Sequence, residues 1–490
     1  MLLEKLLEKL EYECVCGSVQ TQVTDVVYDS RKKIGEGTLF ICIVGASFDG
    51  HDYAAQVAEK GAGVLVVQKD VELSEEQGNR VTVIRVKDTR YAMAFISAAY
   101  FGYPAEKMQV IGITGTKGKT TTTYMVKSIL ENAGRKVGLV GTVEVIIGKE
   151  HIPAANTTPE SYLLQEYFSR MVETGCDTVV MEVSSQALMQ HRTQGFLFDY
   201  GIFTNMEPDH IAPGEHSSFE EYMACKGLLF RQCRVGIVNS DDSHWQTVLA
   251  GHTCDLETYG LKEGADLQAK DIKLAKEAGK LGVRFNVSGL INMEVEVAAP
   301  GKFSVYNGLT AIAICRHFGV APKDIRKALL GIKVRGRIEP VKVSDEFTLL
   351  IDYAHNAMSL ESLLRSLREY DPGRLVCLFG CGGNRSKLRR YEMGEVSGRL
   401  ADLTIITSDN PRFEEPQDII DDIKIGMAKT DGKFVEIPDR KEAIAYAIAH
   451  GQPGDIVVLA GKGHEDYQEI KGVKYPMDER ILIADILAGR

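Results

Sequence analysis

The stretch Val110-Ile-Gly-Ile-Thr-Gly-Thr-Lys-Gly-Lys-Thr120 decides the fold of the middle of this chain. Its first residues are apolar and β-branched, which predicts a buried strand, and they run directly into a glycine-rich turn. Thr121 to Asn132 then has the spacing of an amphipathic helix, closed by Gly134. A strand, a glycine-rich turn and a helix in this order gather backbone N–H groups at a helix N-terminus, where phosphate is favoured. The stretch therefore predicts a nucleotide-phosphate loop.

This loop departs from the strict phosphate-binding pattern GxxxxGK[ST], because the residue five positions before Gly118 is Ile113. Lys119 still supplies a cation for phosphate, and the Thr120 hydroxyl falls where a Mg²⁺ ligand is needed. We expect ATP phosphates at this loop. The residues expected to contact them are Gly115, Thr116, Lys117, Gly118, Lys119, Thr120 and Thr121.

Apolar runs of strand length recur on both sides of the loop and alternate with helical segments. This pattern predicts an α/β fold with mostly parallel sheets that are covered on both faces. The clearest runs are Thr38–Val44, Gly63–Val67, Thr178–Val183, Tyr200–Thr204, Val235–Val238, Leu349–Tyr353, Leu375–Phe379, Leu403–Thr407 and Ile456–Ala460. Asp266 to Val297 alternates in polarity instead, which predicts a β-rich excursion. We divide the chain into three domains, 1–107, 108–335 and 336–490.

Composition limits the classes of function. The 490 residues carry a formal net charge of −11, which argues against a general nucleic-acid binder. No stretch approaches the about 18 apolar residues of a membrane span, and the charged N-terminus lacks the core of a signal peptide. The ten cysteines show no CxxC spacing, so reduced thiols in a cytoplasmic protein are expected. A monomer is the expected state.

Three side chains follow successive strands of the middle segment. Glu182 lies near the end of the run Val179–Val183, His210 follows the run Thr204–Asp209, and Lys226 lies in a helix with apolar spacing. Because ligands bind beyond the carboxyl ends of parallel strands, Glu182 and His210 are expected near the phosphate loop. Mg²⁺ prefers oxygen ligands, so Glu182 suits it and a histidine is less usual. Taken alone, Lys226 would be a solvated helix lysine.

Further motifs carry a resemblance to a known family. They are Met181-Glu-Val-Ser-Ser-Gln-Ala-Leu188, Asp209-His210, Asp352-Tyr-Ala-His355, Asp409-Asn-Pro-Arg412 and Gly461-Lys-Gly-His-Glu-Asp-Tyr-Gln468. With the phosphate loop, they make the chain similar to the Mur ligase family from about Asp29 to Asp478. The resemblance is strongest to the members that add the third amino acid to the peptidoglycan precursor. Gln186 departs from the family, which usually has histidine there, and Ser304 stands where asparagine is common.

The resemblance implies a central P-loop-type ATPase domain with a parallel sheet, an N-terminal α/β domain for the UDP precursor, and a C-terminal Rossmann-like domain. It implies that ATP phosphorylates the D-glutamate γ-carboxylate of a UDP-N-acetylmuramoyl dipeptide and that an amine then attacks the acyl phosphate. It also implies Mg²⁺ held by Thr120, Glu182, His210 and Lys226, the last carrying a CO₂-derived carbamate. Lys119 is the expected catalytic cation.

Other positions match the family's binding residues. Those matching ATP contacts are Asn307, Arg337 and Asp352. Those matching precursor contacts are Ser30, Thr157, Thr158, Ser184, Gln190 and Arg192. Those matching amino-acid contacts are Arg385, Asp409, Asn410, Pro411, Arg412, Gly461 and Glu465.

Arg412 bears on which amino acid is added. The side chain of meso-2,6-diaminopimelate ends in a carboxylate as well as an ammonium, whereas that of L-lysine ends in an ammonium alone. A guanidinium is suited to the extra carboxylate, so meso-diaminopimelate is favoured. L-lysine, a Mur-like paralogue and a folylpolyglutamate-synthase-type ligase stay open as alternatives. A P-loop nucleotide switch or kinase is the alternative outside the ligases.

Overall fold

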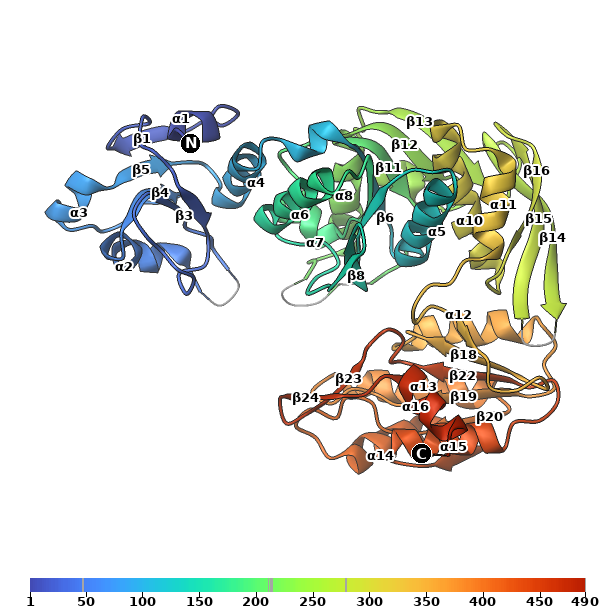
Figure 1. Ribbon diagram of the computed structural model, residues 1–490. Helices are drawn as coiled ribbons and strands as arrows, with labels where there is room; N and C mark the ends of the chain where they lie inside the picture. Colours follow the sequence, from blue (N-terminus) through green and yellow to red (C-terminus); the bar gives the residue numbers. More distant parts are fainter. Residues whose placement is uncertain (46–47, 210, 212–214, 278–279, 490) are drawn as a thin grey trace. The chain divides into compact units, whose positions relative to one another are not determined.

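A computed structural model describes residues 1–490 except 46–47, 210, 212–214, 278–279 and 490 (Figure 1). The chain forms two compact units. Unit 1 comprises Met1–Asp266 and Thr310–Val320, and unit 2 comprises Leu267–Leu309 and Ala321–Arg490. Among the described residues, no helix is both long and apolar enough to cross a membrane.

Unit 1 begins with a five-stranded sheet of order β1-β5-β4-β3-β2, in which only the β1–β5 pair is antiparallel. Its strands are β1 (Glu13–Cys16), β2 (Asp25–Val27), β3 (Thr38–Ile41), β4 (Ala62–Val67) and β5 (Thr82–Arg85). Its helices are α1 (Leu3–Leu6), α2 (Ala54–Glu59), α3 (Glu75–Arg80) and α4 (Thr89–Tyr100). Apolar residues of α1 and α4 pack with one set of strand side chains, and those of α2 pack with the other set. The sheet is therefore covered on both faces, as predicted.

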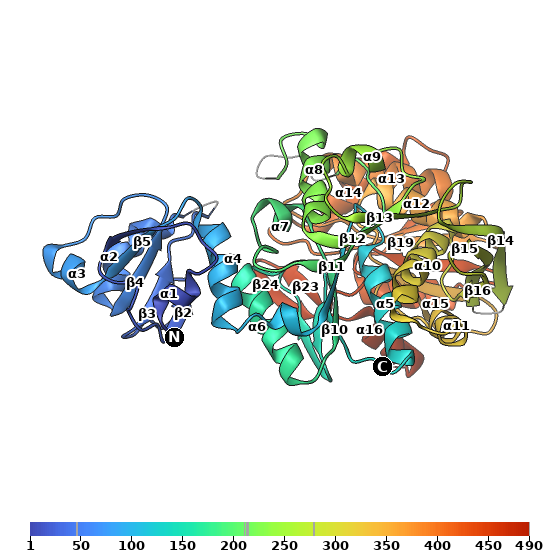
Figure 2. The same cartoon turned by 90° about the horizontal axis from the view of Figure 1, so that it is seen from above.

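The second sheet in unit 1 has the order β13-β12-β11-β6-β10-β7-β8-β9. Its strands are β6 (Gln109–Thr114), β7 (Val137–Val140), β8 (Glu144–Ile147), β9 (Glu150–Pro153), β10 (Thr178–Glu182), β11 (Phe198–Phe203), β12 (Cys233–Asn239) and β13 (Asp255–Gly260). Its helices are α5 (Lys119–Asn132), α6 (Ser161–Glu173), α7 (Ser185–Met189), α8 (Phe219–Gly227) and α9 (Trp245–Val248). Across the sheet, the neighbouring pairs from β13 through β6 to β7 are parallel. Strand β8 pairs antiparallel with both β7 and β9, which forms the antiparallel edge. Helix α6 lies beside α4 (Figure 2).

Strand β6 lies between β10 and β11, and the chain leaves it first toward β7 and later returns to its other side at β11. This is the switch point where parallel sheets bind ligands. The strand is buried on both faces, which explains its continuous apolar run. The phosphate loop therefore stands at the expected place in the sheet.

Unit 2 begins with an antiparallel β-ribbon and continues into a six-stranded sheet of order β17-β18-β22-β19-β20-β21. Ribbon strands β14 (Leu267–Glu277), β15 (Lys280–Gly289) and β16 (Met293–Val297) confirm the predicted β-rich excursion. The sheet strands are β17 (Glu339–Val341), β18 (Thr348–Asp352), β19 (Leu375–Phe379), β20 (Leu403–Ile406), β21 (Phe434–Glu436) and β22 (Ile456–Ala460). Only the edge strand β17 is antiparallel to its neighbour. A separate hairpin is formed by β23 (Tyr467–Ile470) and β24 (Val473–Pro476).

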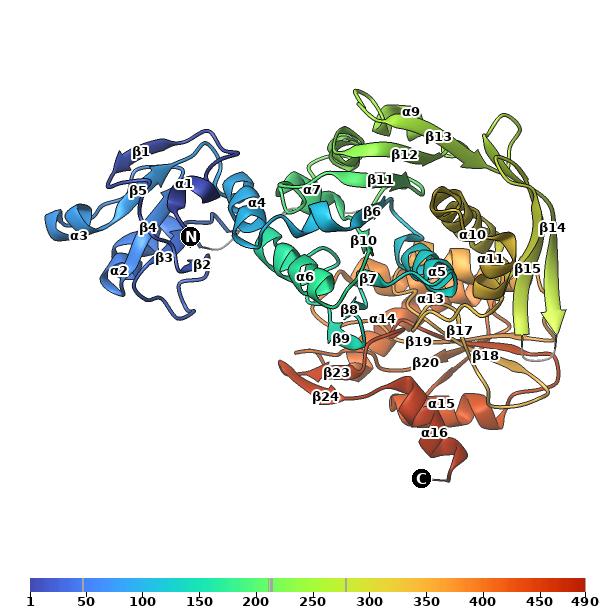
Figure 3. The ribbon, with the colours of Figure 1, turned by 45° about the horizontal axis from the view of Figure 1, so that its top comes forward.

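Helices cover both faces of the six-stranded sheet (Figure 3). The helices of unit 2 are α11 (Pro322–Leu330), α12 (Ala357–Arg368), α13 (Lys387–Leu400), α14 (Pro416–Met427), α15 (Arg440–Ala449) and α16 (Glu479–Leu487), and α10 (Lys302–Cys315) belongs partly to each unit. Side chains of α12, α13 and α14 pack with Leu350, Cys377 and Val458, whereas those of α15 and α16 pack with the alternate residues Ile351 and Val457. The predicted doubly wound α/β architecture is confirmed.

Candidate active site

The phosphate loop joins β6 to α5 and depends on two glycines. Gly115 has φ +140°, and a Cβ there would come within 2.0 Å of Thr204 Oγ1. Gly118 caps α5 with φ +86°, a conformation that other residues rarely adopt. These positions therefore require glycine for backbone geometry and close packing.

Two residues that sequence reasoning did not single out hold the loop in place. Asn205 Oδ1 accepts a hydrogen bond from Lys117 N–H (2.8 Å), and its amide donates to Lys117 O (3.0 Å). Thr204 Oγ1 donates to the same carbonyl (2.8 Å). Both follow β11, the strand beside β6. Their signal in the sequence was their position after an apolar run in the segment that precedes His210.

Two lysines point at the carbonyl oxygen of Gly115. Lys119 Nζ donates to it at 2.8 Å, and Lys226 Nζ donates to it at 3.1 Å. Lys226 is only 2% exposed, and its ammonium lies 4.4 Å from the centroid of the Tyr222 ring. Burial, together with the charge of Lys119, holds the pKa of Lys226 well below that of an ordinary lysine. The solvated position expected for Lys226 in isolation is wrong, because α8 packs this face into the core.

Glu182 ends β10 beside the phosphate strand, and it is almost fully buried. Its Oε2 accepts hydrogen bonds from Thr120 Oγ1 and Thr142 Oγ1, both at 3.0 Å, and its Oε1 accepts from Thr142 N–H at 2.8 Å. A hydroxyl and a carboxylate next to a phosphate loop are oxygen donors of the kind Mg²⁺ prefers. The residues present therefore fit this ion, with Thr120 and Glu182 in contact with each other.

His210, also predicted as a metal ligand, lies outside the described residues. Within the part of the chain that the structure describes, no three His, Cys, Asp or Glu side chains are grouped as a metal site. The nearby His216 was not singled out from sequence. It is buried, and its Nε2 lies 2.8 Å from Ser185 Oγ.

The predicted precursor residues of the central sheet form one cluster. Thr158 Oγ1 donates to Glu182 O (2.9 Å) and accepts from Ser184 N–H (3.0 Å). Arg192 donates to Thr158 O (3.0 Å) and to Gln190 Oε1 (2.8 Å). Thr157 Oγ1 lies 3.0 Å from Thr142 Oγ1, which connects this cluster to Glu182.

Glu160 and Arg90 extend this cluster and were missed from sequence. Glu160 forms ion pairs with Arg192 (2.8 Å) and with Arg90 (3.2 Å). Arg90 stands in the first turn of α4, so the pair joins α4 to the start of α6. Ser30 follows β2, where its carbonyl accepts from Lys60 Nζ (3.2 Å). Nothing in the sequence spacing indicated these pairings, which depend on tertiary packing.

In unit 2, two of the predicted ATP residues, Arg337 and Asp352, lie around the end of β18. Both carboxylate oxygens of Asp352 accept backbone N–H groups, Oδ2 from Ile338 (2.9 Å) and Oδ1 from Ala354 (2.8 Å). Burial raises the pKa of Asp352, and Arg337 opposes that shift. The Arg337 guanidinium also lies 5.0 Å from the centroid of the Tyr353 ring. Asn307 is buried on α10.

The predicted amino-acid residues gather where β20 and β22 end. Asn410 Nδ2 donates to Glu465 Oε2 (2.9 Å), and the Asp409 carboxylate accepts from Asn410 N–H (2.6 Å). Gly461 has φ +106°, and a Cβ there would lie 3.1 Å from Asp409 Oδ2. Pro411 is buried, and a Cβ on Gly383 would lie 1.9 Å from its carbonyl oxygen. These residues therefore pack as one group.

Arg412 is half-buried beside this group with φ +53°, in the left-handed region. Its Nε lies 3.2 Å from Glu469 Oε2, and its Nη1 donates to Gly383 O (2.7 Å). Arg385 is exposed in the loop after β19. The cluster thus presents a guanidinium and a carboxylate, Glu465, within one set of loops. Burial raises the pKa of Glu465, but the facing Lys462 outweighs it and lowers that pKa below its usual value.

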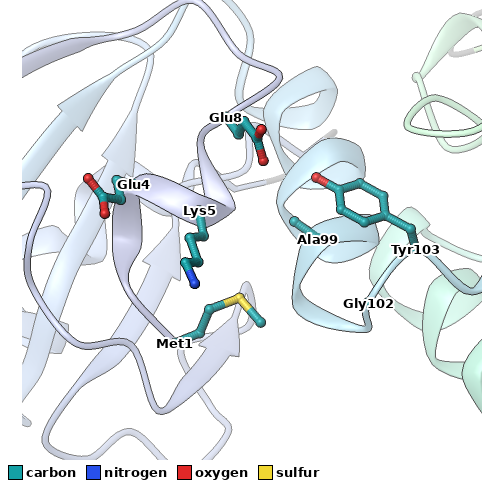
Figure 4. A pocket seen from close by; sticks show the side chains of 7 residues that line it. All are labelled: Met1, Glu4, Lys5, Glu8, Ala99, Gly102 and Tyr103. Carbon is teal, nitrogen blue, oxygen red and sulfur yellow. The ribbon is translucent and has the colours of Figure 1, made fainter.

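A surface hollow lies between α1 and the end of α4 (Figure 4). It is lined by Met1, Glu4, Lys5, Glu8, Ala99, Gly102 and Tyr103. The lining mixes both signs of charge and includes none of the predicted site residues. The hollow therefore adds nothing to the site.

The chain matches three domains described for one family. Residues 22–101 match the Mur ligase family catalytic domain, residues 113–315 the Mur ligase middle domain, and residues 336–463 the Mur ligase glutamate ligase domain. These matches cover most of the sequence and include the phosphate loop from Ile113 onward. The predicted ATP-dependent ligase class is confirmed.

A curated relative is 42% identical over 489 residues, spanning 100% of this chain and 99% of its own length. It is the UDP-N-acetylmuramoyl-L-alanyl-D-glutamate--2,6-diaminopimelate ligase of Caldanaerobacter subterraneus subsp. tengcongensis. A solved structure of a ligase with the same name aligns with a TM-score of 0.72 and 26% identity, covering 100% of this chain and 99% of that one. This likeness confirms the three-domain α/β fold.

A folylpolyglutamate synthase from Mycobacterium tuberculosis, complexed with ADP, aligns with a TM-score of 0.61. It is 16% identical and covers 76% of this chain and 91% of its own length, so it shares the fold alone. For the family of this chain, the three domain matches and the 42% identical relative carry more weight than this structural likeness. This chain belongs to the Mur ligase family.

Proposed function

We propose that this enzyme uses ATP to join meso-2,6-diaminopimelate to the D-glutamate of UDP-N-acetylmuramoyl-L-alanyl-D-glutamate, a step in peptidoglycan precursor synthesis. The observation that carries this assignment is the cluster of Asn410, Arg412 and Glu465 in a chain with a 42% identical full-length relative of that name. A guanidinium suits the distal carboxylate of the diamino acid, and a carboxylate suits its ammonium. We further propose a cytoplasmic monomer with domain boundaries at 1–107, 108–335 and 336–490.

Activation of the precursor takes place at the phosphate loop. ATP transfers its γ-phosphoryl group to the D-glutamate γ-carboxylate, giving an acyl phosphate and ADP. Loop N–H groups and Lys119 bind the phosphates and offset the repulsion between carboxylate and triphosphate. Mg²⁺ would be held by Thr120 and Glu182, with His210, and would add positive charge when bound.

Amide formation needs an amine in its neutral form. The amine of the diamino acid attacks the acyl carbon, the bond to the phosphate oxygen breaks, and inorganic phosphate leaves with that electron pair. The amine nitrogen gives up one proton to solvent as the amide forms. Asp409, Asn410, Pro411, Arg412, Gly461, Glu465 and Arg385 would bind this substrate, and Asn307, Arg337 and Asp352 would bind ATP.

The precursor is assigned to the cluster around Arg192. Arg192 bonds to Thr158 and Gln190. Ser184 bonds to Thr158, Thr157 lies beside Thr142, and Ser30 follows β2 of the N-terminal sheet. Arg192 shares Glu160 with Arg90, so two cations stand around one carboxylate. The local excess of positive charge suits a substrate that carries phosphates and carboxylates.

Lys226 is proposed to carry a carbamate. The reaction joins its neutral Nζ to the carbon of CO₂ with loss of one proton to solvent, which converts a neutral amine into an anion. The burial of Lys226 and its lowered pKa support this, because only the neutral amine reacts. A carbamate would become a further oxygen donor beside the phosphate loop, where Lys226 Nζ now contacts Gly115 O.

A competition assay tests the function. Purified enzyme is given ATP, Mg²⁺ and the UDP precursor with meso-diaminopimelate, L-lysine or both, and ADP and the amide product are quantified. We expect one ADP per amide and strong preference for meso-diaminopimelate. Preference for L-lysine would overturn the amino-acid assignment, and ADP release without either substrate would overturn the ligase assignment itself.

A further inference from the structure

Lys462 is a fully buried cation in the loop that follows β22. Its side chain is 0% exposed, which is rare for a lysine unless the charge is paired. Its Nζ donates to Glu465 Oε2 (2.7 Å), to Asn410 Oδ1 (3.0 Å) and to the carbonyl of Tyr467 (2.5 Å). Asp409 Oδ1 lies 4.0 Å away. Lys462 is therefore bonded to two proposed amino-acid residues and lies near a third.

These bonds determine how the Asn410 amide is oriented. An ammonium can only donate, so the atom of Asn410 facing Lys462 must be the oxygen. The same Oδ1 accepts from Glu469 N–H at 2.9 Å, a second donor that requires the same orientation. The amide nitrogen must then face Glu465, where Nδ2 donates to Oε2 at 2.9 Å. Two independent donors thus fix one of the two possible orientations of the Asn410 amide.

The same contacts orient Glu465. Its Oε2 accepts from both Lys462 and Asn410, whereas within the described part of the chain the contact to its Oε1 is a long one of 3.4 Å from the Tyr353 hydroxyl. Oε1 is therefore the atom with the capacity to accept from a ligand ammonium. Lys462 is also the cation whose charge lowers the pKa of Glu465 and so favours its ionised form.

We propose that Lys462 is a positioning residue for the amino-acid substrate, fixing Asn410 and Glu465 so that Glu465 Oε1 is presented to the substrate ammonium. This inference rests on the proposed function for the identity of that substrate. Lys462 touches no reacting atom and acts through its two partners. Its loss should therefore weaken amino-acid binding selectively.

Steady-state kinetics of the full-length enzyme test this with Lys462→Met and Lys462→Arg. We expect Lys462→Met to raise KM for meso-diaminopimelate by about 10- to 100-fold, as for a lost charged hydrogen bond. KM for ATP and for the UDP precursor should change less than about threefold. Lys462→Arg keeps the charge and should recover part of the loss.

The matched control is Arg374→Met. Arg374 also pairs with a buried carboxylate, Asp455 at 2.6 Å, but at the opposite ends of β19 and β22. This variant should lower the thermal unfolding midpoint without changing KM for the amino acid. If Lys462→Met behaves as Arg374→Met does, or raises all three KM values together, Lys462 is a structural residue and the proposal fails.

A double variant sharpens the test. Because Lys462 acts through Glu465, combining Lys462→Met with Glu465→Gln should raise KM little beyond the larger single effect. Additive effects would overturn the proposal. If Lys462→Met does not fold, Lys462→Gln replaces it in the same cycle, and an unchanged KM for the amino acid in a folded Lys462→Gln variant overturns the proposal. Should the wild type prefer L-lysine, the proposed function fails while the Lys462 effect is still measured on L-lysine.

Discussion

The phosphate loop of unit 1 and the amino-acid cluster of unit 2 are built by different means. At the phosphate loop, glycine conformations set the backbone, and Lys119 and Lys226 both donate to one backbone carbonyl, that of Gly115. At the amino-acid cluster, charged side chains from separate loops hold each other, with Lys462 and Asn410 both bonded to Glu465. The first site depends on local chain geometry, and the second depends on tertiary pairing.

This difference has a consequence for specificity. A backbone-built loop recognises any phosphate chain of the right length, because N–H groups do not distinguish what the phosphates carry. A cluster of oriented side chains distinguishes ligands by the number and sign of their end groups. On the proposed assignment, general phosphate chemistry belongs to the first site and selection of the amine to the second.

Removing Lys119 should give the largest loss. Lys119→Ala deletes the main counter-charge for the transferred phosphate, and turnover should fall by about 10³-fold or more while folding persists. ADP release and circular dichroism are the measurements. Near-normal turnover would mean that the phosphates are neutralised elsewhere and that this loop is not the site of phosphoryl transfer.

A methyl group on Gly115 should come next. Gly115→Ala places a Cβ 2.0 Å from Thr204 Oγ1 at φ +140°, so the loop must shift, and activity should fall by about 10²-fold. Gly134→Ala is the control, since it also has positive φ (+86°) but no atom within 4 Å of the added Cβ. Equal losses in both variants would show that strain alone, rather than the shape of the loop, is responsible.

Arg412→Ala should affect the other site only. We expect KM for meso-diaminopimelate to rise by about 10- to 100-fold, with KM for ATP and for the precursor nearly unchanged. Arg365→Ala, which removes an exposed arginine paired with Glu361 on α12, serves as the control and should change none of the three. A parallel rise in all three KM values for Arg412→Ala would mark a structural arginine.

The smallest expected effect concerns His464, next to Glu465. Burial, together with the charge of Arg337, lowers the pKa of His464 to about 4. Its neutral form is thus favoured in the fold, so below the usual value near 6.5 the unfolded chain binds the proton more readily and stability falls toward pH 4. His464→Asn should remove this slope, about 1 kcal/mol between pH 6.5 and 5, measured by thermal melts. An unchanged slope in His464→Asn would show that other titrating groups cause this loss of stability.

The sequence predicted the parts of the molecule that local patterns determine. Strands Leu375–Phe379 and Ile456–Ala460 have the predicted bounds, and the strand and helix around the phosphate loop are in place. These segments are continuous apolar runs or glycine turns, whose signal lies within a few residues. The domain boundaries and the roles of the site residues stay predictions.

Local sequence patterns did not predict the contacts between distant segments. Asn205, Glu160 and Lys462 are polar residues in loops, and nothing in their neighbours indicates Lys117, Arg90 or Asn410 as partners. Lys226 shows the same limit, since its burial depends on how α8 packs. The whole fold determines which loops lie close enough for their side chains to pair, so local sequence patterns do not reveal these pairings.

A line of hydrogen bonds runs from Thr120 through Glu182 and Thr142 to Thr157, entirely within unit 1. The proposed contacts to the amine lie entirely within unit 2. On the proposed assignment, substitutions at the amine contacts can therefore accumulate without touching any residue in the hydrogen-bonded line around Glu182. On the same assignment, binding of an inhibitor along the Glu182 line would not depend on which amine the enzyme accepts.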